Sequence, residues 1–212
     1  MKIHICNDNK VFPFFYVDDF YTPEEEKLIW RELDFYTDRP NAPLFHRAEE
    51  DKRTGRYRDG TAQSKGWRIY LNNLYQIQNV SHILRLQPLK MSSDEIQDAI
   101  KETGPNFRMY GITNFDQMLI NYYEGGDYYE PHTDGFMMTV ICWFYRTPKS
   151  YTGGDLTFTD IDVILECKHN RMVMFPSYYF HMVYPIKMKD KNSEMGQGRY
   201  AIQDFYCQKT ID

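Results

Sequence analysis

The second half of the chain is a series of short apolar segments separated by turn residues, and this pattern restricts the possible folds most strongly. Segments of strand length that are rich in β-branched and aromatic residues typically form antiparallel sheets. Several of them in succession predict a sandwich or barrel, and a double-stranded β-helix (jelly roll) fits best. The predicted strands cover Met118–Tyr123, Met138–Tyr145, Asp155–Thr159, Met172–Phe175, Met182–Ile186 and Tyr200–Cys207.

The first half of the chain contains the predicted helices, which would pack outside this mainly β core. Thr22-Pro23-Glu24-Glu25 has the residue types of a helix N-terminus, because Thr22 and Glu25 can form a capping box and Pro23 suits the first turn. A helix is predicted from there to about Asp34. The other predicted elements are a strand over Val11–Asp19, a strand over Trp67–Leu71, and a helix from Ser92 or Ser93 through Ile100 that ends at Gly104 and Pro105.

Length and hydrophobic content set the domain organisation. A chain of 212 residues with 42% hydrophobic residues can bury one core, so we predict a single domain over 1–212. Residues 1–110 would form a supporting region of helices and strands, and residues 111–208 the jelly-roll core. The segments 37–65 and 187–198 are polar, so both are predicted to be loops. The first of them is either a solvated connector or a substrate-covering lid.

The charge and cysteine content bear on partners and location. A net charge of -5 disfavours a general nucleic-acid binder, which carries a net basic face, although local basic patches remain open. The four cysteines are too widely spaced for a paired metal or redox motif, which favours a reduced compartment. Because no secretory or transmembrane segment is recognisable, we expect a cytoplasmic protein without a membrane partner. The oligomeric state stays open.

Two histidines and one aspartate form a candidate metal site in the second half. Residues two apart in a strand point to the same side, so His132 and Asp134 are expected to face the barrel interior from one strand. Such a pair alone is common by chance. His181 lies on a separate segment and would complete the set. Two imidazoles and one carboxylate suit iron(II) and leave coordination positions open for substrate and oxygen.

The residues around this set resemble the signature of prolyl 4-hydroxylase-type 2-oxoglutarate/iron(II) dioxygenases. Tyr123, Gly126, Tyr129, His132 and Asp134 occupy its five marked positions. The order and spacing of the family hold from about Phe115 to Tyr206, and the resemblance is much weaker over roughly the first hundred residues. The later matches are the glycine pair Gly153-Gly154, the strand over Asn170–Pro176, the distal histidine His181 and the basic residue Arg199.

This resemblance implies an enzyme that hydroxylates an unactivated C–H bond while 2-oxoglutarate is converted to succinate and carbon dioxide. His132, Asp134 and His181 would be the catalytic metal ligands for iron(II), with a position left for dioxygen. Arg199 would bind the far carboxylate of 2-oxoglutarate through its charged fork, and Tyr123 would add a hydroxyl donor. Ascorbate is the candidate reductant.

The substrate implied by the resemblance is a prolyl or other side chain of a protein or peptide. Tyr129 and Trp143 are the candidate substrate contacts. The protein would also exclude water from the reaction site. Apolar residues expected to form that dry wall, or else simply to pack in the core, are Met138, Ile141, Trp143, Phe175 and Phe205.

Three other functions remain open. The first is nucleic-acid oxidation by an alkylation-repair-like dioxygenase, although Phe205 stands where that group usually has a second arginine, and Gly135-Phe136 follows the aspartate where acidic residues are usual. The second is hydroxylation of a free amino acid. The third is a non-catalytic jelly roll that keeps a metal. Arg199 and the glycine pair disfavour this last function, and a structural metal site is usually closed by a fourth ligand.

Overall fold

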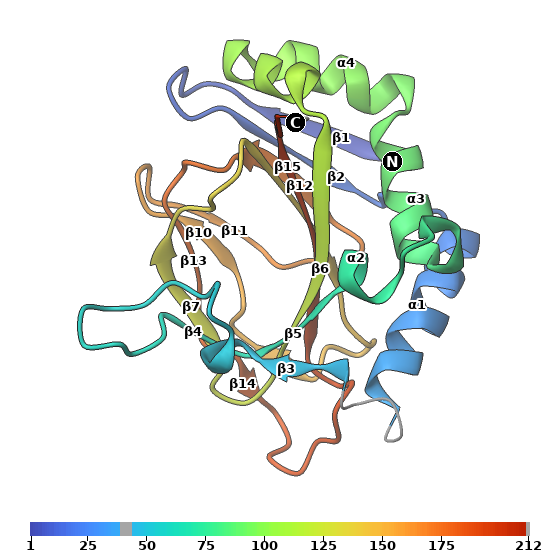
Figure 1. Ribbon diagram of the computed structural model, residues 1–212, viewed down its shortest axis with the longest axis vertical. Helices are drawn as coiled ribbons and strands as arrows, with labels where there is room; N and C mark the ends of the chain where they lie inside the picture. The colour runs from blue at the N-terminus through green and yellow to red at the C-terminus, as the bar shows by residue number, and fades with distance from the viewer. Residues whose placement is uncertain (39–43, 211–212) are drawn as a thin grey trace.

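Two antiparallel sheets that face each other form the centre of the molecule (Figure 1). The structure, a computed structural model, describes residues 1–38 and 44–210. The eight-stranded sheet contains, in spatial order, β1 (Lys2–Cys6), β2 (Phe14–Asp18), β12 (Met172–Pro176), β8 (Met138–Phe144), β15 (Arg199–Cys207), β6 (Phe115–Tyr123), β5 (Trp67–Tyr70) and β3 (His46–Arg47). The five-stranded sheet contains β11 (Val163–Leu165), β10 (Leu156–Phe158), β13 (His181–Val183), β7 (Tyr128–His132) and β4 (Ser64–Lys65), and a separate ribbon pairs β14 (Lys187–Met188) with β9 (Tyr151–Thr152). The predicted jelly roll is confirmed.

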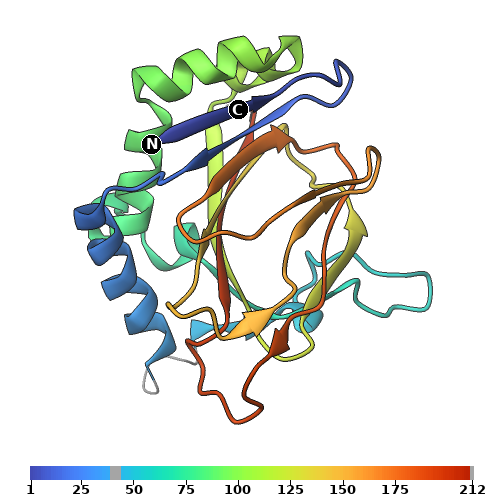
Figure 2. The ribbon, with the colours of Figure 1, turned by 180° about the vertical axis from the view of Figure 1, so that it is seen from behind.

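The helices pack outside the sheets, as the front and back views of the ribbon show (Figure 1, Figure 2). α1 (Pro23–Thr37) begins at the predicted capping box, in which the Glu25 amide donates to Thr22 Oγ1 at 3.3 Å and the Thr22 amide donates to Glu25 Oε2 at 2.8 Å. The remaining helical segments are α2 (Leu71–Leu74), α3 (His82–Met91), α4 (Asp94–Thr103) and the 3-10 segments η2 (Ala48–Glu50), η3 (Gln78–Val80) and η4 (Pro105–Ile112). Among the described residues, no helix is both long enough and apolar enough to cross a membrane.

Alternate residues of the central strands serve two different cores. On β15, Tyr200 and Ile202 pack beneath the helices, whereas Ala201 lies between the sheets. Because both faces are covered, β15 is buried almost throughout its length. Met138 belongs to the core beneath the helices, so of its two expected roles core packing holds; it lies three residues before Ile141 and points to the other face of β8. The core between the sheets includes Ile141, Trp143, Leu156, Phe158, Val173 and Phe175.

The N-terminal half contributes more to the sheets than its sequence pattern predicts. The strand predicted over Val11–Asp19 is β2, and it pairs with β1, which the polar N-terminus does not predict. α3 is also unpredicted, since Pro88 lies inside it; Ser81 caps its N-terminus, with a hydroxyl that accepts from the Leu84 amide at 3.0 Å. Within the predicted loop 37–65, β3 and β4 each join a sheet, while residues 39–43 lie outside the described part of the chain.

Asp204 is a buried carboxyl group on the helix side of β15. Asp204 is fully buried. Its Oδ1 has no hydrogen-bond partner among the described residues, whereas its Oδ2 accepts from the Tyr206 hydroxyl. Burial, with a smaller effect of the neighbouring Asp116, raises the pKa of Asp204 well above its usual value. A carboxyl with a raised folded pKa stabilises the fold while it is protonated, and this contribution is lost as the pH rises above about 4, its unfolded value.

We therefore expect the Asp204→Asn variant to have a different pH dependence of stability. The free energy of unfolding of the wild type should decrease more steeply from about pH 5 to about pH 7 than that of Asp204→Asn, because the asparagine has no proton to lose. Urea unfolding at the two pH values measures this difference. Equal slopes for the two proteins would show that the Asp204 carboxyl is already ionised in the fold.

Candidate active site

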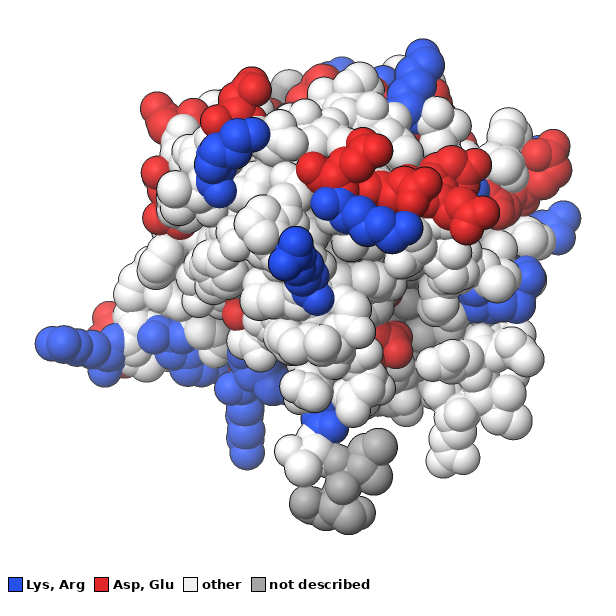
Figure 3. All heavy atoms as spheres, turned by 90° about the horizontal axis from the view of Figure 1, so that it is seen from above, with Lys and Arg blue, Asp and Glu red and all other residues white. Residues whose placement is uncertain are grey.

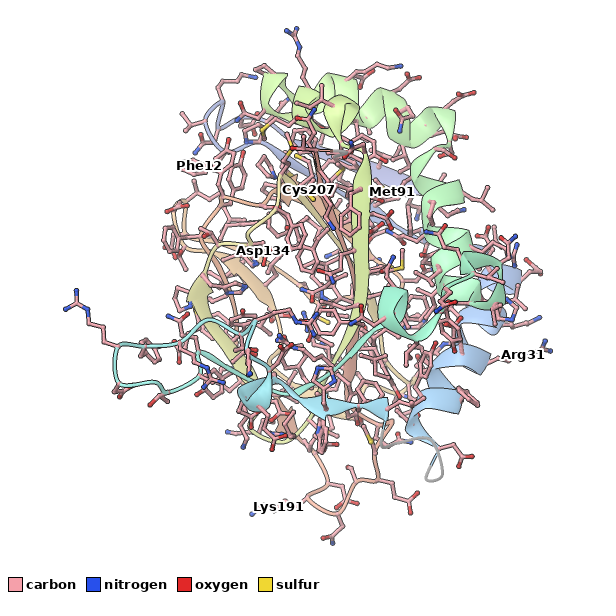
Figure 4. The ribbon with its side chains drawn as sticks, in the orientation of Figure 1. Phe12, Arg31, Met91, Asp134, Lys191 and Cys207 are labelled. Atoms are coloured by element: carbon pink, nitrogen blue, oxygen red, sulfur yellow. The ribbon has the colours of Figure 1, made fainter. Side chains whose placement is uncertain are left out.

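Two of the predicted metal ligands face each other across neighbouring strands. His132 is the last residue of β7 and His181 is the first of β13, and the antiparallel register pairs them directly. Asp134 lies beyond the end of β7, so the expectation that it shares a strand with His132 is wrong. Its backbone amide instead donates to the Ser177 carbonyl oxygen at 2.9 Å, and the residue lies within the barrel (Figure 4).

The three side chains converge on a common point. Asp134 Oδ1 lies 3.6 Å from His132 Nε2, and Asp134 Oδ2 lies 3.5 Å from His181 Nε2. One ligand atom of each residue lies within 4.8 Å of the other two, and no other such group of three occurs in the described part of the chain. Nitrogen and oxygen ligands about 2.1 Å from one ion lie up to roughly 4 Å apart, so this spacing suits a shared metal.

Hydrogen bonds to the backbone fix the orientation of both imidazoles. His132 Nδ1 lies 2.8 Å from the carbonyl oxygen of Glu130. His181 Nδ1 lies 2.9 Å from the carbonyl oxygen of Tyr179. Because a carbonyl oxygen only accepts, Nδ1 carries the proton in each neutral ring, and Nε2 keeps its lone pair on the side of Asp134. Burial lowers the pKa of His181 to about 4, so its ring is neutral at neutral pH.

Asp134 is held in its ionised form beside the imidazoles. The Thr139 hydroxyl donates to Asp134 Oδ2 at 2.7 Å and lies 2.8 Å from the Ser177 hydroxyl. Burial opposes ionisation, but attraction to the protonated forms of His181 and His132, together with the hydrogen bond from Thr139, outweighs it and holds the pKa of Asp134 below its usual value. The group therefore offers two imidazole nitrogens and one carboxylate, the donor set that suits non-haem iron(II).

A pocket of about 530 Å³ opens beside these side chains and is lined by His132 and Asp134. Its volume lies in the range of small-molecule sites. Tyr129, an expected substrate contact, also lines the pocket and stacks on His132, with 3.5 Å between the ring centroids. Other lining side chains are the polar Arg53, Arg68, Asn121 and Gln203 and the aromatic pair Phe136 and Phe205.

Arg199 has a buried guanidinium that lacks a hydrogen-bond partner within residues 1–38 and 44–210. Its residue is 1% exposed, and none of its three side-chain nitrogens bonds to any other described residue. Its Cζ lies 5.1 Å from the ring centroid of Tyr123 and 5.7 Å from that of Trp143. A buried charge without hydrogen bonds is costly, so this position suits an anionic partner. Trp143 is fully buried here and does not line the pocket.

The glycine pair lies where side chains would not fit, and Gly154 packs against this arginine. Gly154 has a φ of +78°, and a Cβ on it would lie 2.4 Å from Ile186 Cδ1 and 2.9 Å from Arg199 Cδ. Gly153 has a φ of +77°, and its Cβ would lie 2.2 Å from the Pro185 carbonyl oxygen. Both positions therefore require glycine for conformation and for space.

Gly154→Ala is accordingly expected to lower the free energy of unfolding by about 2–4 kcal/mol, from the left-handed backbone and the overpacked contact together. Gly125→Ala is the matched control, since its Cβ would meet nothing nearer than Met188 Cγ at 3.8 Å. Thermal or urea unfolding compares the two variants. A loss in Gly125→Ala as large as that in Gly154→Ala would contradict the local explanation.

Four polar pocket residues were not predicted from the sequence. Asn121 lies two residues before Tyr123, and Gln203 lies two residues before Phe205, so the alternation of β6 and β15 contains a signal for both. The amide of Asn121 donates to the Gln203 side-chain oxygen. Arg53 and Arg68 have no comparable signal, because their positions depend on how the loop 37–65 folds against β5.

The family model of the 2OG-Fe(II) oxygenase superfamily matches residues 118–206, which contain the three candidate metal ligands and Arg199. This part of the chain belongs to the 2OG-Fe(II) oxygenase superfamily. The protein is thus an oxygenase of the 2-oxoglutarate-dependent type, and the superfamily implies iron(II), 2-oxoglutarate and dioxygen as its cofactors. No curated protein matches the sequence.

Solved structures with the same fold include several prolyl hydroxylases. A Pseudomonas putida prolyl-4-hydroxylase has a TM-score of 0.59 and 15% identity to this oxygenase, with 96% of this chain and 97% of that chain covered. A Trichoplax adhaerens prolyl hydroxylase in complex with a hypoxia inducible factor peptide fragment has a TM-score of 0.60 and 15% identity, with 92% and 83% covered. A Burkholderia pseudomallei 2OG-Fe(II) oxygenase has a TM-score of 0.57 and 11% identity, with 96% and 88% covered. At these identities the likeness shows the fold.

Proposed function

We propose that this oxygenase hydroxylates an unactivated C–H bond in a side chain of a protein or peptide, with proline as the first candidate. The main observation behind the proposal is the convergence of His132, Asp134 and His181 beside a pocket. Arg199 lies in the same barrel, and its guanidinium has no hydrogen-bond partner among the described residues. The choice of a peptide is supported by the similar prolyl hydroxylase that is in complex with a peptide fragment. Succinate and carbon dioxide would be the other products.

His132, Asp134 and His181 would hold iron(II), which supplies the activation of dioxygen when it is bound. The chain contributes the orientation of its ligands: both Nε2 lone pairs lie on the side of the Asp134 carboxylate. It also contributes a dry wall. Phe175 belongs to the core between the sheets and contacts His181 edge-on, with 4.9 Å between ring centroids. It would shield the three metal ligands from water on that side.

Arg199 would bind the far carboxylate of 2-oxoglutarate, because a guanidinium can donate two parallel hydrogen bonds to a carboxylate. Burial raises the pKa of Tyr123, although Arg199 opposes this shift, so the phenol keeps its proton and can donate as well. Trp143 packs on the same guanidinium and would form one side of the 2-oxoglutarate site. Tyr129, at the pocket, would contact the substrate to be hydroxylated.

Nucleic acid is a weaker candidate substrate. The net charge is -5, and on the face seen from above acidic side chains gather at the upper left and the upper right, with lysines and arginines beside and below them (Figure 3). Phe205 stacks on Phe136, with 4.8 Å between ring centroids, at the position where a second arginine would serve a nucleic-acid oxygenase.

A succinate-release screen tests the proposed function. The substrate sets are proline-containing peptides, free amino acids and oligonucleotides, each with iron(II), 2-oxoglutarate and ascorbate as the proposed reductant. We expect only the peptides to raise succinate release above the substrate-free rate and to gain one oxygen atom by mass spectrometry. His181→Ala serves as the blank. Release driven by free amino acids or oligonucleotides alone would overturn the assignment of a peptide substrate.

A further inference from the structure

Two arginines line the pocket from elements outside the family match. Arg53 comes from the loop 37–65 and Arg68 from β5. Asp134 is the one carboxylate among the described residues that line this pocket, and its charge would be taken by the metal. The side chains that line the pocket therefore carry a surplus of positive charge.

A single carboxylate holds both arginines. Asp51 Oδ1 accepts from the Arg53 backbone amide at 3.0 Å and from Arg53 Nε at 3.1 Å. Asp51 Oδ2 lies 3.5 Å from Arg68 Nη1 and accepts from the Tyr70 hydroxyl at 2.7 Å. Asp51 is buried and close to both guanidiniums, so it positions them as a pair.

The charges of this cluster do not cancel. Burial opposes the ionisation of Asp51, but its hydrogen bonds with Arg53 and Tyr70 hold its pKa well below the usual value. His46 lies 3.7 Å from Asp51, and burial lowers its pKa, so the imidazole adds no charge at neutral pH. Two guanidiniums thus share one carboxylate, and one positive charge is left over. A single surplus charge matches a singly charged anion.

Arg68 also has a side-chain N–H group, at Nε, that could donate to a ligand. Its side chain is 5% exposed, and Nη1 donates to Thr54 Oγ1 at 3.0 Å, whereas its buried Nε has no partner among the described residues. A buried charged donor without an acceptor is costly. Arg53 is half-exposed at the pocket, with its Cζ 3.4 Å from the Tyr70 ring centroid.

Arg68 is separated from the candidate metal ligands by about one side chain. Tyr129 stacks on His132, and Arg68 lies close enough to Tyr129 to oppose the burial that raises the pKa of this phenol to about 12. In the sheet, Arg68 pairs in register with Asn121, which also lines the pocket. A group bound by Arg68 would therefore lie beside the reacting part of the substrate.

We propose that Arg53 and Arg68 bind a carboxylate of the substrate, so that this oxygenase selects a hydroxylation site next to an acidic group. This inference rests on the proposed function and names its substrate class more closely. A carboxylate matches the leftover charge and the fork of a guanidinium. The stacked Phe136 and Phe205 at the same pocket would take the apolar part of the substrate. The carboxylate can come from an acidic side chain or from a chain terminus.

Affinity selection with three peptide pools tests this inference and separates the two sources. All pools carry a central proline and an acetylated N-terminus. The first has glutamate beside the proline and an amidated C-terminus; the second has glutamine and a free C-terminal carboxylate; the third has glutamine and an amidated C-terminus. The protein is loaded with manganese(II) and N-oxalylglycine, an unreactive analogue of 2-oxoglutarate, and retained peptides are measured by mass spectrometry.

We expect the wild type to retain the first or the second pool roughly tenfold more than the third, as one charge-assisted hydrogen bond would give. Arg68→Gln and Arg53→Gln should lose that preference, while Arg58→Gln, on an exposed position of the same loop, should keep it. Arg53 is half-exposed, so Arg53→Gln should fold even if Arg68→Gln does not, and it then serves as the test on its own. The inference would be overturned if the wild type retained the three pools equally or retained none of them. It would also be overturned if the preference for a carboxylate survived in Arg53→Gln. If peptides do not raise succinate release by the wild type in the separate screen, the proposed function is overturned instead.

Discussion

Asp134→Ala is expected to abolish succinate formation and to weaken iron(II) binding by more than about 100-fold. Loss of a hydrogen-bond partner behind a metal ligand alone costs about 10–100-fold in affinity, and this substitution removes the one charged ligand itself. The Thr139 hydroxyl keeps its contact with Ser177 at 2.8 Å, so the variant should still fold. Titration of iron(II) against a competing chelator, without oxygen, measures the affinity.

The matched control for this variant is Asp98→Ala. Asp98 is exposed on α4 and pairs only locally with Lys101, so iron binding and turnover should stay at the wild-type level. Iron affinity of Asp134→Ala within a few-fold of the wild type would show that Asp134 is not a ligand.

Arg199→Met is expected to raise the 2-oxoglutarate concentration for half-maximal succinate formation by roughly 100-fold or more, while iron(II) affinity changes little. The substitution removes the two charge-assisted hydrogen bonds that we propose Arg199 makes to 2-oxoglutarate, each worth about 1.5–3 kcal/mol. It also removes a buried charge that has no partner in the described structure, so the free energy of unfolding without 2-oxoglutarate should not fall. Initial rates at varied 2-oxoglutarate and urea unfolding measure the two effects.

Arg199→Lys separates the charge of this residue from its geometry. A lysine keeps the positive charge but cannot donate through a planar fork, so its 2-oxoglutarate requirement should lie between those of the wild type and Arg199→Met. If Arg199→Met needs no more 2-oxoglutarate than the wild type, Arg199 serves only the packing around Tyr123 and Trp143.

The parts of the fold and site that local sequence patterns could predict lie on single strands or at single turns. The capping box of α1 is one case, because Thr22 and Glu25 interact over three residues. The resemblance also marked His132, Asp134, His181 and Arg199, which the antiparallel pairing of β7 with β13 and the length of β15 place around one barrel. The strand alternation behind Asn121 and Gln203 was equally readable.

What the sequence could not predict depends on contacts between distant segments. Asp134 leaves β7 because its amide bonds to Ser177, a residue more than forty positions later, and no local pattern encodes that turn. The cluster of Asp51, Arg53 and Arg68 joins a polar loop to a strand, and its members have no periodic spacing. Which core Met138 joins could not be predicted either, because a strand buried on both faces has no polar side to indicate its orientation.

The most direct test of the proposed iron and 2-oxoglutarate site is the visible spectrum of the protein under anaerobic conditions. Iron(II) chelated by the keto acid should give the wild type a weak charge-transfer band. The same band should appear in Arg199→Met only at much higher 2-oxoglutarate, and it should be missing in Asp134→Ala at any concentration. An unchanged band in Asp134→Ala would contradict the assignment of His132, Asp134 and His181 as the metal ligands.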